Sequence, residues 1–336
     1  MTNLSPLDGL RLARIGIRNY ITKRPLVLSF EVTLSCNCNC RHCDLGGIIK
    51  DEKRLKPDDY TRLTQLLDPP VVQISGGEPL LREDIVDVVK AIKPTKRIPY
   101  LIFVTNGALL NENIYLQLHE AGVNQLSVSL DFPDERHDDF RRHRGLYKHL
   151  DQTIPRLAKF GFRDIILNTA ITKANLKDIL PLAQKAMDWN VSISYSAYTP
   201  LRTGDQSYFI NDEEDLETLR KTIYELIELK KQGYCITNSK AILLETLKFF
   251  EQGCMPNCKA GIRFFVIMPD GSFIPCSLHR NKYSCQKEMI EGFSRTNQCG
   301  ACYVAIRSYS DRPLWKSLKD APAFGKQLFT QPKEAT

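Results

Sequence analysis

The sequence predicts an α/β fold built on a mostly parallel sheet, and one repeated pattern supports this. Short runs rich in apolar and β-branched residues are followed by longer helical patterns, and this alternation repeats along the chain from residue 26. Strands joined by helices form right-handed βα units, which place successive strands parallel. We expect strands at 26–34, 70–75, 100–105, 125–131, 164–171 and 191–197, and helices near 57–67, 83–93, 111–121, 145–160 and 175–188. Ligands of such sheets bind at the carboxyl ends of the strands.

The composition describes an ordinary globular protein. Its 336 residues, 43% of them hydrophobic, suffice for one large domain and one small one. The net charge of +7 is mild and no basic run carries interleaved aromatic residues, which disfavours nucleic acid as a partner. No apolar run approaches the roughly 18 residues of a membrane span, so only peripheral membrane contact stays open. Most of the 11 cysteines fall in two groups without a preceding signal peptide, which predicts metal ligation in a reducing cytoplasm.

Residues 1–25 are expected to form an amphipathic helix ahead of the main domain. Four aliphatic residues recur near helical spacing beside a basic stripe: Leu7, Leu10, Ile17 and Ile21, with Arg11, Arg14 and Arg18. Two interpretations stay open. The helix packs as a lid on the end of the main domain, or it faces a membrane surface or a partner.

Three cysteines in eight residues directly follow the first predicted strand. Cys36, Cys40 and Cys43 cannot all face one point from a regular element, so the segment must curl around something that binds sulfur. Zinc would require a fourth ligand close by, whereas a four-iron cluster held by three cysteines keeps one iron open for a small molecule. The spacing favours the cluster, with a structural zinc knuckle as the alternative. Cys38 falls between the ligands and is interpreted as a bystander.

This CxxxCxxC motif after a strand resembles the signature of the radical S-adenosylmethionine (SAM) superfamily. The resemblance implies a partial (β/α)6 TIM-like barrel over residues 26–235 and a [4Fe–4S] cluster that binds SAM and cleaves it to a 5′-deoxyadenosyl radical. The second strand ends in Gly76, Gly77, Glu78 and Pro79, which is similar to the family's GGEP motif. There the backbone and the glutamate bind the amino group of SAM, and the two glycines permit close backbone approach.

Further cofactor contacts are expected at the ends of later strands. Alternation points Ser127, Ser129 and Asp131 into the barrel lumen. The resemblance suggests contacts with SAM from Thr105, Asn106, Ser129, Asp131, Arg141 and Asn168, with Arg141 meeting the SAM carboxylate. His42, beside the last ligand, could stack on the adenine. The alternatives are turn chemistry at the strand ends and a solvent-exposed histidine.

The later cysteines predict a second metal centre. Cys258 and Cys276 bracket a β-hairpin signalled by Asp270-Gly271, and Cys299 and Cys302 form a CxxC motif. Four thiols suffice for an auxiliary [4Fe–4S] cluster, with zinc as the alternative. The layout resembles the twitch half of the SPASM extension of radical SAM enzymes, placed at 236–336, with a β-hairpin plus helix.

Three other cysteines carry weaker expectations. Cys254 is a rival for one of the four auxiliary ligand positions. Cys285 is interpreted as a free structural thiol, with hydrogen-atom transfer near the substrate as the alternative. Cys235 is expected to be a buried small hydrophobe. No cysteine follows Cys302, so two clusters are expected in all.

The predicted function is that of a radical SAM enzyme, an oxidoreductase or adenosyl-radical transferase. It would abstract hydrogen from, or add to, a small-molecule, peptide or lipid substrate in peptide, cofactor, sugar or lipid biosynthesis. A reductant such as flavodoxin or ferredoxin would supply electrons. The alternatives are a non-catalytic iron–sulfur or zinc scaffold, which has no use for Gly76, Gly77 and Glu78, and an RNA-modifying radical SAM enzyme, which requires a basic patch that is not seen.

Overall fold

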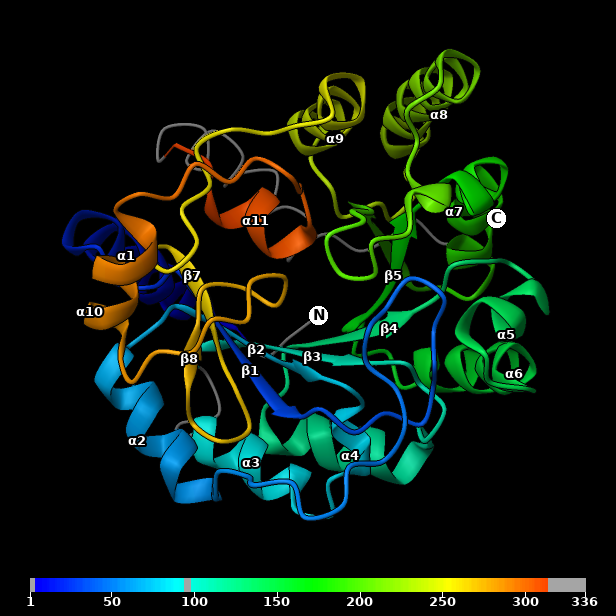
Figure 1. Ribbon diagram of the computed structural model, residues 1–336. Helices are drawn as coiled ribbons and strands as arrows, with labels where there is room; N and C mark the ends of the chain where they lie inside the picture. Colours follow the sequence, from blue (N-terminus) through cyan, green and yellow to red (C-terminus); the bar gives the residue numbers. More distant parts are fainter. Residues whose placement is uncertain (1–3, 94–97, 314–336) are drawn as a thin grey trace.

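The strands of the computed structural model, which describes residues 4–93 and 98–313, form one curved sheet (Figure 1). Its order is β6-β5-β4-β3-β2-β1-β7-β8. All neighbours are parallel except β7 and β8, which form the antiparallel hairpin expected at Asp270-Gly271. The strands are β1 (Val27–Thr33), β2 (Val71–Gly76), β3 (Tyr100–Thr105), β4 (Gln125–Ser129), β5 (Ile165–Ile171), β6 (Ser192–Ala197), β7 (Phe264–Ile267) and β8 (Phe273–Ile274). The predicted partial barrel is confirmed.

Helices cover the outer face of this sheet (Figure 1). Those of the βα units are α2 (Pro57–Leu67), α3 (Ile85–Ile92), α4 (Glu112–Ala121), α5 (Arg136–Arg141), α6 (Leu146–Ala158) and α7 (Ile179–Asp188). The others are α1 (Pro6–Thr22), α8 (Glu213–Lys231), α9 (Lys240–Gln252), α10 (Gln286–Met289) and α11 (Ala305–Ser310). Short 3-10 turns lie at η1 (Pro79–Leu81), η2 (Lys173–Asp178) and η3 (Gln206–Tyr208), and a π-helical turn at η4 (Ile290–Ser294).

The two faces of the sheet differ in chemistry, and β1 shows the difference. Leu28, Phe30 and Val32 are fully buried in the main core beneath the helices. The alternate residues include Ser29, which shares a hydrogen bond of 3.0 Å with Ser75 of β2. Since side chains alternate along a strand, the inner face is polar and is suited to a polar ligand.

Two predicted elements differ from the structure. The fourth strand ends at Ser129 rather than at 131, because the chain turns there toward α5, a short helix that the sequence did not signal. The helix expected at 175–188 begins earlier as the 3-10 turn η2 and becomes α-helical only from Ile179. Thr172 and Asn175 form a reciprocal cap at the start of that turn, which fixes the earlier beginning.

The proposed division of the chain into 1–25, 26–235 and 236–336 stays a prediction. The later segment does not form a separate sheet, because β7 pairs with the outer edge of β1. Residues 1–3 and 314–336 of the outer two units lie outside the described residues. Within the described ranges, no helix is both long enough and apolar enough to cross a membrane.

Candidate active site

The cysteine triplet lies in the loop that follows β1. Cys36 and Cys40 are buried and Cys43 is half-buried. Glu52 holds the start of this loop, since its carboxylate accepts hydrogen bonds from the Thr33 hydroxyl at 2.6 Å and from the Leu34 amide. The sulfur atoms therefore lie at the carboxyl end of the sheet, where the sequence placed them.

Each of the three sulfur atoms receives an N–H group from a different part of the chain. The contacts are Asn106 Nδ2 to Cys36 Sγ at 3.8 Å, Arg141 Nη1 to Cys40 Sγ at 3.8 Å, and Arg202 Nη1 to Cys43 Sγ at 3.1 Å. Hydrogen bonds and positive charge favour the thiolate form of cysteine, which is the form that ligates iron. The donors come from the segments that follow β3, β4 and β6, so only the folded barrel assembles them.

Cys38, interpreted as a bystander, lies between two of the expected ligands. The Cys38 amide donates to Cys36 Sγ at 3.4 Å. Hydrogen bonding to Cys38 lowers the pKa of Cys36 and of Cys40 to about 7, while burial opposes the shift. The charge of Arg141 lowers the pKa of Cys40 further. The pKa of Cys38 itself is raised by the same hydrogen bonds. Hydrogen bonding to Cys38 thus favours the thiolate form of its two neighbours, Cys36 and Cys40.

The two glycines of the Gly-Gly-Glu-Pro motif allow β2 to pass close to the chain that follows β1. Gly76 has φ of 127°, and a Cβ there would lie 2.2 Å from the Thr33 carbonyl oxygen. A Cβ on Gly77 would lie 2.1 Å from the Ser35 carbonyl oxygen. The amides of Gly77 and Glu78 donate to these same two oxygens, each at 2.8 Å. No other residue type fits these positions without moving the cysteine loop.

Glu78 is fully buried and joins β2 to β3. Its carboxylate accepts hydrogen bonds from the Leu80 amide at 3.0 Å, the Thr105 hydroxyl at 2.8 Å and the Asn106 amide at 2.7 Å. Burial raises its pKa to about 7, against these three donors. Pro79 is buried and begins η1. Thr105, Asn106 and the GGEP motif are thus brought together as expected, and contact between Glu78 and SAM stays a prediction.

Asp131 and Arg141 form an ion pair. Two oxygen–nitrogen contacts join them, Nε at 2.8 Å and Nη2 at 2.7 Å from Asp131 Oδ2, and both side chains are buried. Burial raises the pKa of Asp131, but the charge and hydrogen bond of Arg141, together with His42 and His137, outweigh it and hold that pKa below its usual range. Asp131 therefore positions Arg141 against Cys40. Arg141 contacts Cys40, one of the expected cluster ligands, and its expected contact with the SAM carboxylate stays a prediction.

Ser129 and Asn168 remain available to a ligand. They are register partners on β4 and β5, and both are only partly buried. His42, by contrast, stacks on Phe140 with ring centroids 4.8 Å apart and an interplanar angle of 12°. Burial lowers its pKa to about 4, so the ring is neutral. Its ring is not solvent-exposed, and stacking on adenine stays a prediction.

A group of charged residues links the cysteine loop to the later segment, and the sequence analysis did not predict this contact. Arg280, which follows β8, lies 3.1 Å from the buried Glu31 of β1. Arg202 lies 3.1 Å from Asp44, beside Cys43. Glu31 was detectable as a lone carboxylate within an apolar run, whereas Arg202 falls in a polar loop without local signal.

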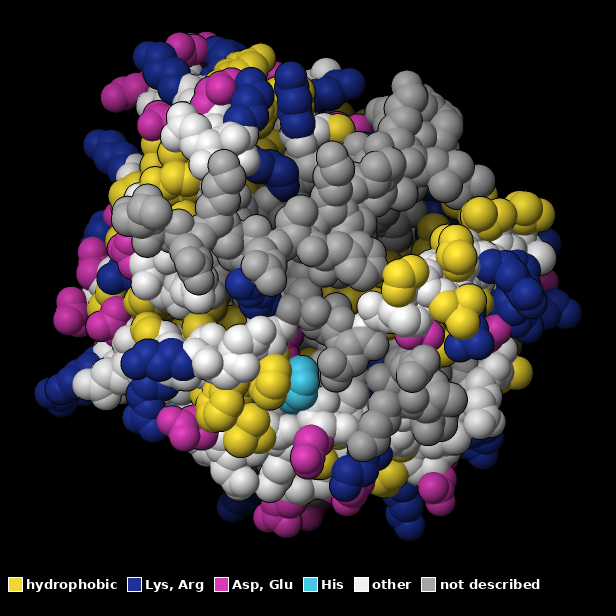
Figure 2. Space-filling model, turned by 180° about the vertical axis from the view of Figure 1, so that it is seen from behind, with side chains coloured by type: hydrophobic (Ala, Val, Ile, Leu, Met, Phe, Trp, Pro, Cys, Tyr) yellow, Lys and Arg dark blue, Asp and Glu magenta, His cyan; other side chains and the backbone are white. Residues whose placement is uncertain are grey.

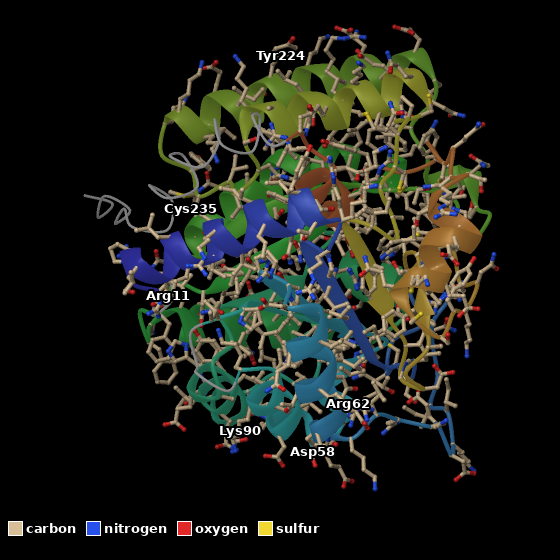
Figure 3. The ribbon with its side chains drawn as sticks, turned by 90° about the vertical axis from the view of Figure 1, so that its left-hand side faces the viewer. Arg11, Asp58, Arg62, Lys90, Tyr224 and Cys235 are labelled. Carbon is tan, nitrogen blue, oxygen red and sulfur yellow. The ribbon has the colours of Figure 1, made fainter. Side chains whose placement is uncertain are left out.

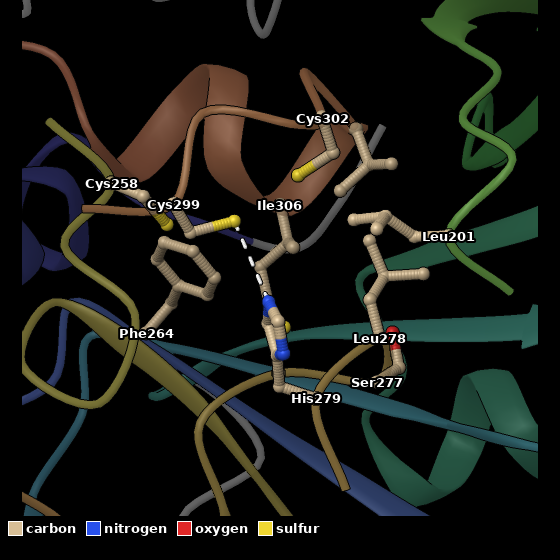
Figure 4. Close-up of a pocket in the computed structure, with 11 residues that line it drawn as sticks. Leu201, Cys258, Phe264, Ser277, Leu278, His279, Cys299, Cys302 and Ile306 are labelled. Atoms are coloured by element: carbon tan, nitrogen blue, oxygen red, sulfur yellow. Dashed lines mark hydrogen bonds between the residues drawn. The ribbon is translucent and has the colours of Figure 1, made fainter. Parts of the chain in front are cut away.

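The four later cysteines lie close together around one small pocket (Figure 4). Cys258, Cys276 and Cys302 are buried and Cys299 is half-buried, although they come from three separate segments. Burial raises the pKa of Cys258 and Cys276 to about 12 each. A bound metal would have to displace those protons.

Two neighbouring side chains contact these sulfur atoms. His279 Nε2 lies 3.5 Å from Cys299 Sγ, and Arg307 Nη1 lies 3.9 Å from Cys302 Sγ. Cys254 and Cys285 are exposed and do not line the pocket, and Cys235 is half-buried rather than fully buried. In the described part of the chain, no three His, Cys, Asp or Glu side chains already converge as a single-ion site.

Comparison with known proteins agrees with this geometry. The sequence profile of the radical SAM superfamily matches residues 30–186. The AdoMet-dependent heme synthase of Methanosarcina barkeri is 30% identical over 224 residues, which are 63% of this chain and 61% of that protein. A probable GTP 3′,8-cyclase of Pyrococcus abyssi is 27% identical over 276 residues, 77% of this chain and 87% of that protein. The chain thus matches less than two thirds of the heme synthase.

Solved structures share the fold. Streptococcus suis SuiB bound to S-adenosylmethionine aligns with a TM-score of 0.60 and 19% identity, over 98% of this chain and 75% of that one. Native anSMEcpe with bound AdoMet aligns with a TM-score of 0.62 and 17% identity, over 90% of this chain and 98% of that one. The profile, the sequence relatives and the fold agree with the cysteine triplet and the Gly-Gly-Glu-Pro motif, and residues 30–186 form a radical SAM superfamily domain.

Proposed function

We propose that this protein cleaves SAM reductively at a [4Fe–4S] cluster held by Cys36, Cys40 and Cys43. The observation that carries the proposal is the set of N–H donors from Asn106, Arg141 and Arg202, one on each sulfur atom. When bound and reduced, the cluster supplies the electron that cleaves SAM to methionine and a 5′-deoxyadenosyl radical. The protein then holds the thiolates and orients the cofactor.

The inner face of the barrel is the proposed place for SAM. The backbone of Gly76 and Gly77 borders the cysteine loop, and Ser129 and Asn168 offer hydrogen-bonding groups further along the sheet edge. Hydroxyl and amide groups suit the ribose and the base of an adenosyl group. Buried surroundings beneath the loop would exclude water from the reacting atoms.

We further propose that Cys258, Cys276, Cys299 and Cys302 hold a second [4Fe–4S] cluster. All four line the same pocket, while Cys254 and Cys285 do not. The Arg307 guanidinium near Cys302 would offset the negative charge of the thiolates.

The substrate would lie between the mouth of the barrel and the later cysteines. One structural neighbour, SuiB, was solved bound to its precursor peptide, while the sequence relatives include a heme synthase and a GTP 3′,8-cyclase. These names support a peptide or a small biosynthetic molecule as substrate, with a lipid as the further candidate. A flavodoxin or ferredoxin would serve as reductant in a reducing cytoplasm.

The test combines iron counting with a SAM-cleavage assay on the same anaerobically reconstituted sample. Two clusters give about eight irons per chain, and dithionite should release 5′-deoxyadenosine. Cys40→Ala should lose about half of the iron and all of the cleavage. Cys285→Ala, at an exposed cysteine outside both groups, is the matched control and should change neither.

Three outcomes would count against parts of this proposal. Absence of 5′-deoxyadenosine at every iron load would favour the non-catalytic scaffold. About four irons with normal cleavage would remove the second cluster. Salt-dependent RNA binding would favour an RNA-modifying enzyme.

A further inference from the structure

α1 places four aliphatic side chains in solvent. Leu7, Leu10, Ile17 and Ile21 are 54%, 69%, 38% and 70% exposed. The fully buried residues of the helix are instead Asp8 and Asn19. Asn19 Nδ2 donates to the Pro25 carbonyl oxygen at 2.8 Å and to the Asp68 carbonyl oxygen at 2.9 Å, which anchors the helix. A surface helix normally turns its apolar stripe toward the core, and α1 does the reverse.

The same face of α1 is basic. At 100° per residue, Arg11, Arg14 and Arg18 fall with the four aliphatic residues within about a third of the helix circumference. Lys23 and Arg24 follow directly and are exposed. From Pro6 to Arg24 the only acidic residue is Asp8, which is buried and lies 3.5 Å from Arg11.

Figure 2 shows this face from behind the barrel, with hydrophobic side chains gathered at its right edge, where α1 lies, next to Lys and Arg side chains. Figure 3 looks directly at α1 and labels Arg11 on it. Arg18 is turned toward the protein, because it lies 2.7 Å from Asp68. Arg11 and Arg14 are thus the cations of the helix that are directed to solvent.

We propose that α1 is an interfacial helix that binds an anionic lipid bilayer surface. Exposed aliphatic side chains interleaved with arginines are the composition of helices that lie in the headgroup region, where the long arginine side chains reach the phosphates. The cations match a negatively charged leaflet. The proposal is independent of the proposed function.

A second copy of the chain fits this face less well. Residue 14 is at the middle of Pro6–Thr22, so Arg14 would face the same residue of the other copy in a symmetric helix pair. Like charges meeting at the centre of an apolar contact oppose association. The same Arg14 is favourable against a phosphate surface.

Docking through α1 would leave the active site accessible. α1 leads into the amino-terminal end of β1, whereas the cysteine loop follows the carboxyl-terminal end. The seven residues of β1 separate the two by about 23 Å. A reductant could therefore reach the cluster loop while α1 contacts a membrane.

The test is co-sedimentation of the reconstituted protein with lipid vesicles. We expect binding to phosphatidylcholine vesicles that contain about one third phosphatidylglycerol, little binding to phosphatidylcholine alone, and weaker binding at high salt. Leu10→Glu combined with Ile21→Glu should reduce binding to background. Arg14→Gln should lower the partition coefficient about fivefold. Tyr224→Glu, at a 54% exposed residue of α8 (Figure 3), is the matched control and should bind normally.

Several results would overturn the proposal. These are equal binding to neutral and anionic vesicles, binding that survives the Leu10→Glu and Ile21→Glu substitutions, or no binding to either vesicle. A dimer seen by light scattering that these two substitutions dissociate would identify a second copy as the occupant. Unchanged thermal melting of each variant would show that it is folded.

Discussion

Gly77 is a position where one added methyl group should disturb the whole site. Its Cβ would meet the Ser35 carbonyl oxygen at 2.1 Å, one residue before Cys36. We expect Gly77→Ala to lower the free energy of unfolding by about 3 kcal/mol, because backbone rather than a flexible side chain must move. SAM binding should weaken with it.

Thermal melting of the reconstituted protein would measure this effect. Gly9→Ala is the matched control, since nothing lies within 4 Å of its added Cβ in α1. That substitution should stabilise the protein by about 0.5–1 kcal/mol through helix propensity. Equal effects at the two glycines would show that close packing of β2 on the cysteine loop is unimportant.

His137 should make the protein sensitive to acid. It is fully buried, its Nδ1 accepts a hydrogen bond from the Asp131 amide at 3.1 Å, and burial lowers its pKa to about 3. Below pH 6.5 the unfolded chain takes up a proton at this residue, whereas the folded chain does not. The free energy of unfolding therefore decreases as the pH falls. The loss amounts to about 1.4 kcal/mol per pH unit.

The measurement is urea unfolding at pH 6.5 and pH 5. The wild-type protein should lose about 2 kcal/mol more than His137→Gln over this interval. The same pH dependence in both proteins would place the acid sensitivity elsewhere. The effect of the buried His137 can be compared with that of His119, a histidine that is partly exposed and pairs with Asp164.

Single residues also differ in how far their roles could be predicted from the sequence. The cysteines and the Gly-Gly-Glu-Pro motif were found because each is a short contiguous pattern with its own chemistry. The contact between Arg141 and Cys40 spans about a hundred residues of sequence, and the polar loop around Arg202 gave no reason to place it beside Cys43.

At the scale of elements, Arg82 joins β1, α2 and the turn before α3. Its buried guanidinium donates to the carbonyl oxygens of Val32 and Leu55 and to the Tyr60 hydroxyl, each at 3.0 Å, and pairs with Asp84 at 2.7 Å. We expect Arg82→Met to destabilise the protein by about 3 kcal/mol, because it leaves buried acceptors without donors.

Chemical denaturation would measure the effect of Arg82→Met. Arg62→Met on α2 is the control, because that side chain is 75% exposed and pairs only across one helical turn, with Asp59. Its loss should cost less than about 0.5 kcal/mol. A similarly small cost at Arg82 would contradict the proposed anchoring of α2 and α3.

Elements also differed in how well the sequence located them. The boundaries of α2 were predicted because a Pro at its first turn and an apolar period of 3.6 mark them. α5 was missed because it is six residues long and rich in charge, so it shows no apolar period. It forms because Phe140 and His137 are buried against the site.

At the scale of the whole molecule, the ion pair of Glu31 and Arg280 joins the later segment to the barrel. Glu31 is 3% exposed and Arg280 is 28% exposed, with 3.1 Å between them. A double-mutant cycle with Glu31→Gln and Arg280→Met should give a coupling energy of about 1–3 kcal/mol, since the pair is largely shielded from water.

The exposed pair of Lys282 and Asp270, at 2.6 Å, is the matched control. Its coupling should stay below about 1 kcal/mol despite the shorter distance, because water screens it. Coupling energies of the same size would show that the later segment is held to the barrel by its β7 pairing rather than by this charge pair.

The sequence alone determined the fold class and predicted the chemistry that we propose for the site. Cysteine spacing, the glycine pair and the alternation of strands and helices are local or periodic, so they can be read along the chain. They predicted the barrel, the cysteine loop and the family. The apolar stripe of α1 was also visible as a pattern in the sequence. The pattern did not show that the stripe faces solvent.

Only the tertiary structure determined which residues contact each other. It paired Asp131 with Arg141, gathered four distant cysteines around one pocket, and turned the apolar stripe of α1 to solvent by burying Asp8 and Asn19. Such contacts depend on the packing of elements far apart in sequence, where burial and hydrogen bonding outweigh local propensity. A pattern along the chain fixes which residues can share a face, and packing selects the face that is covered.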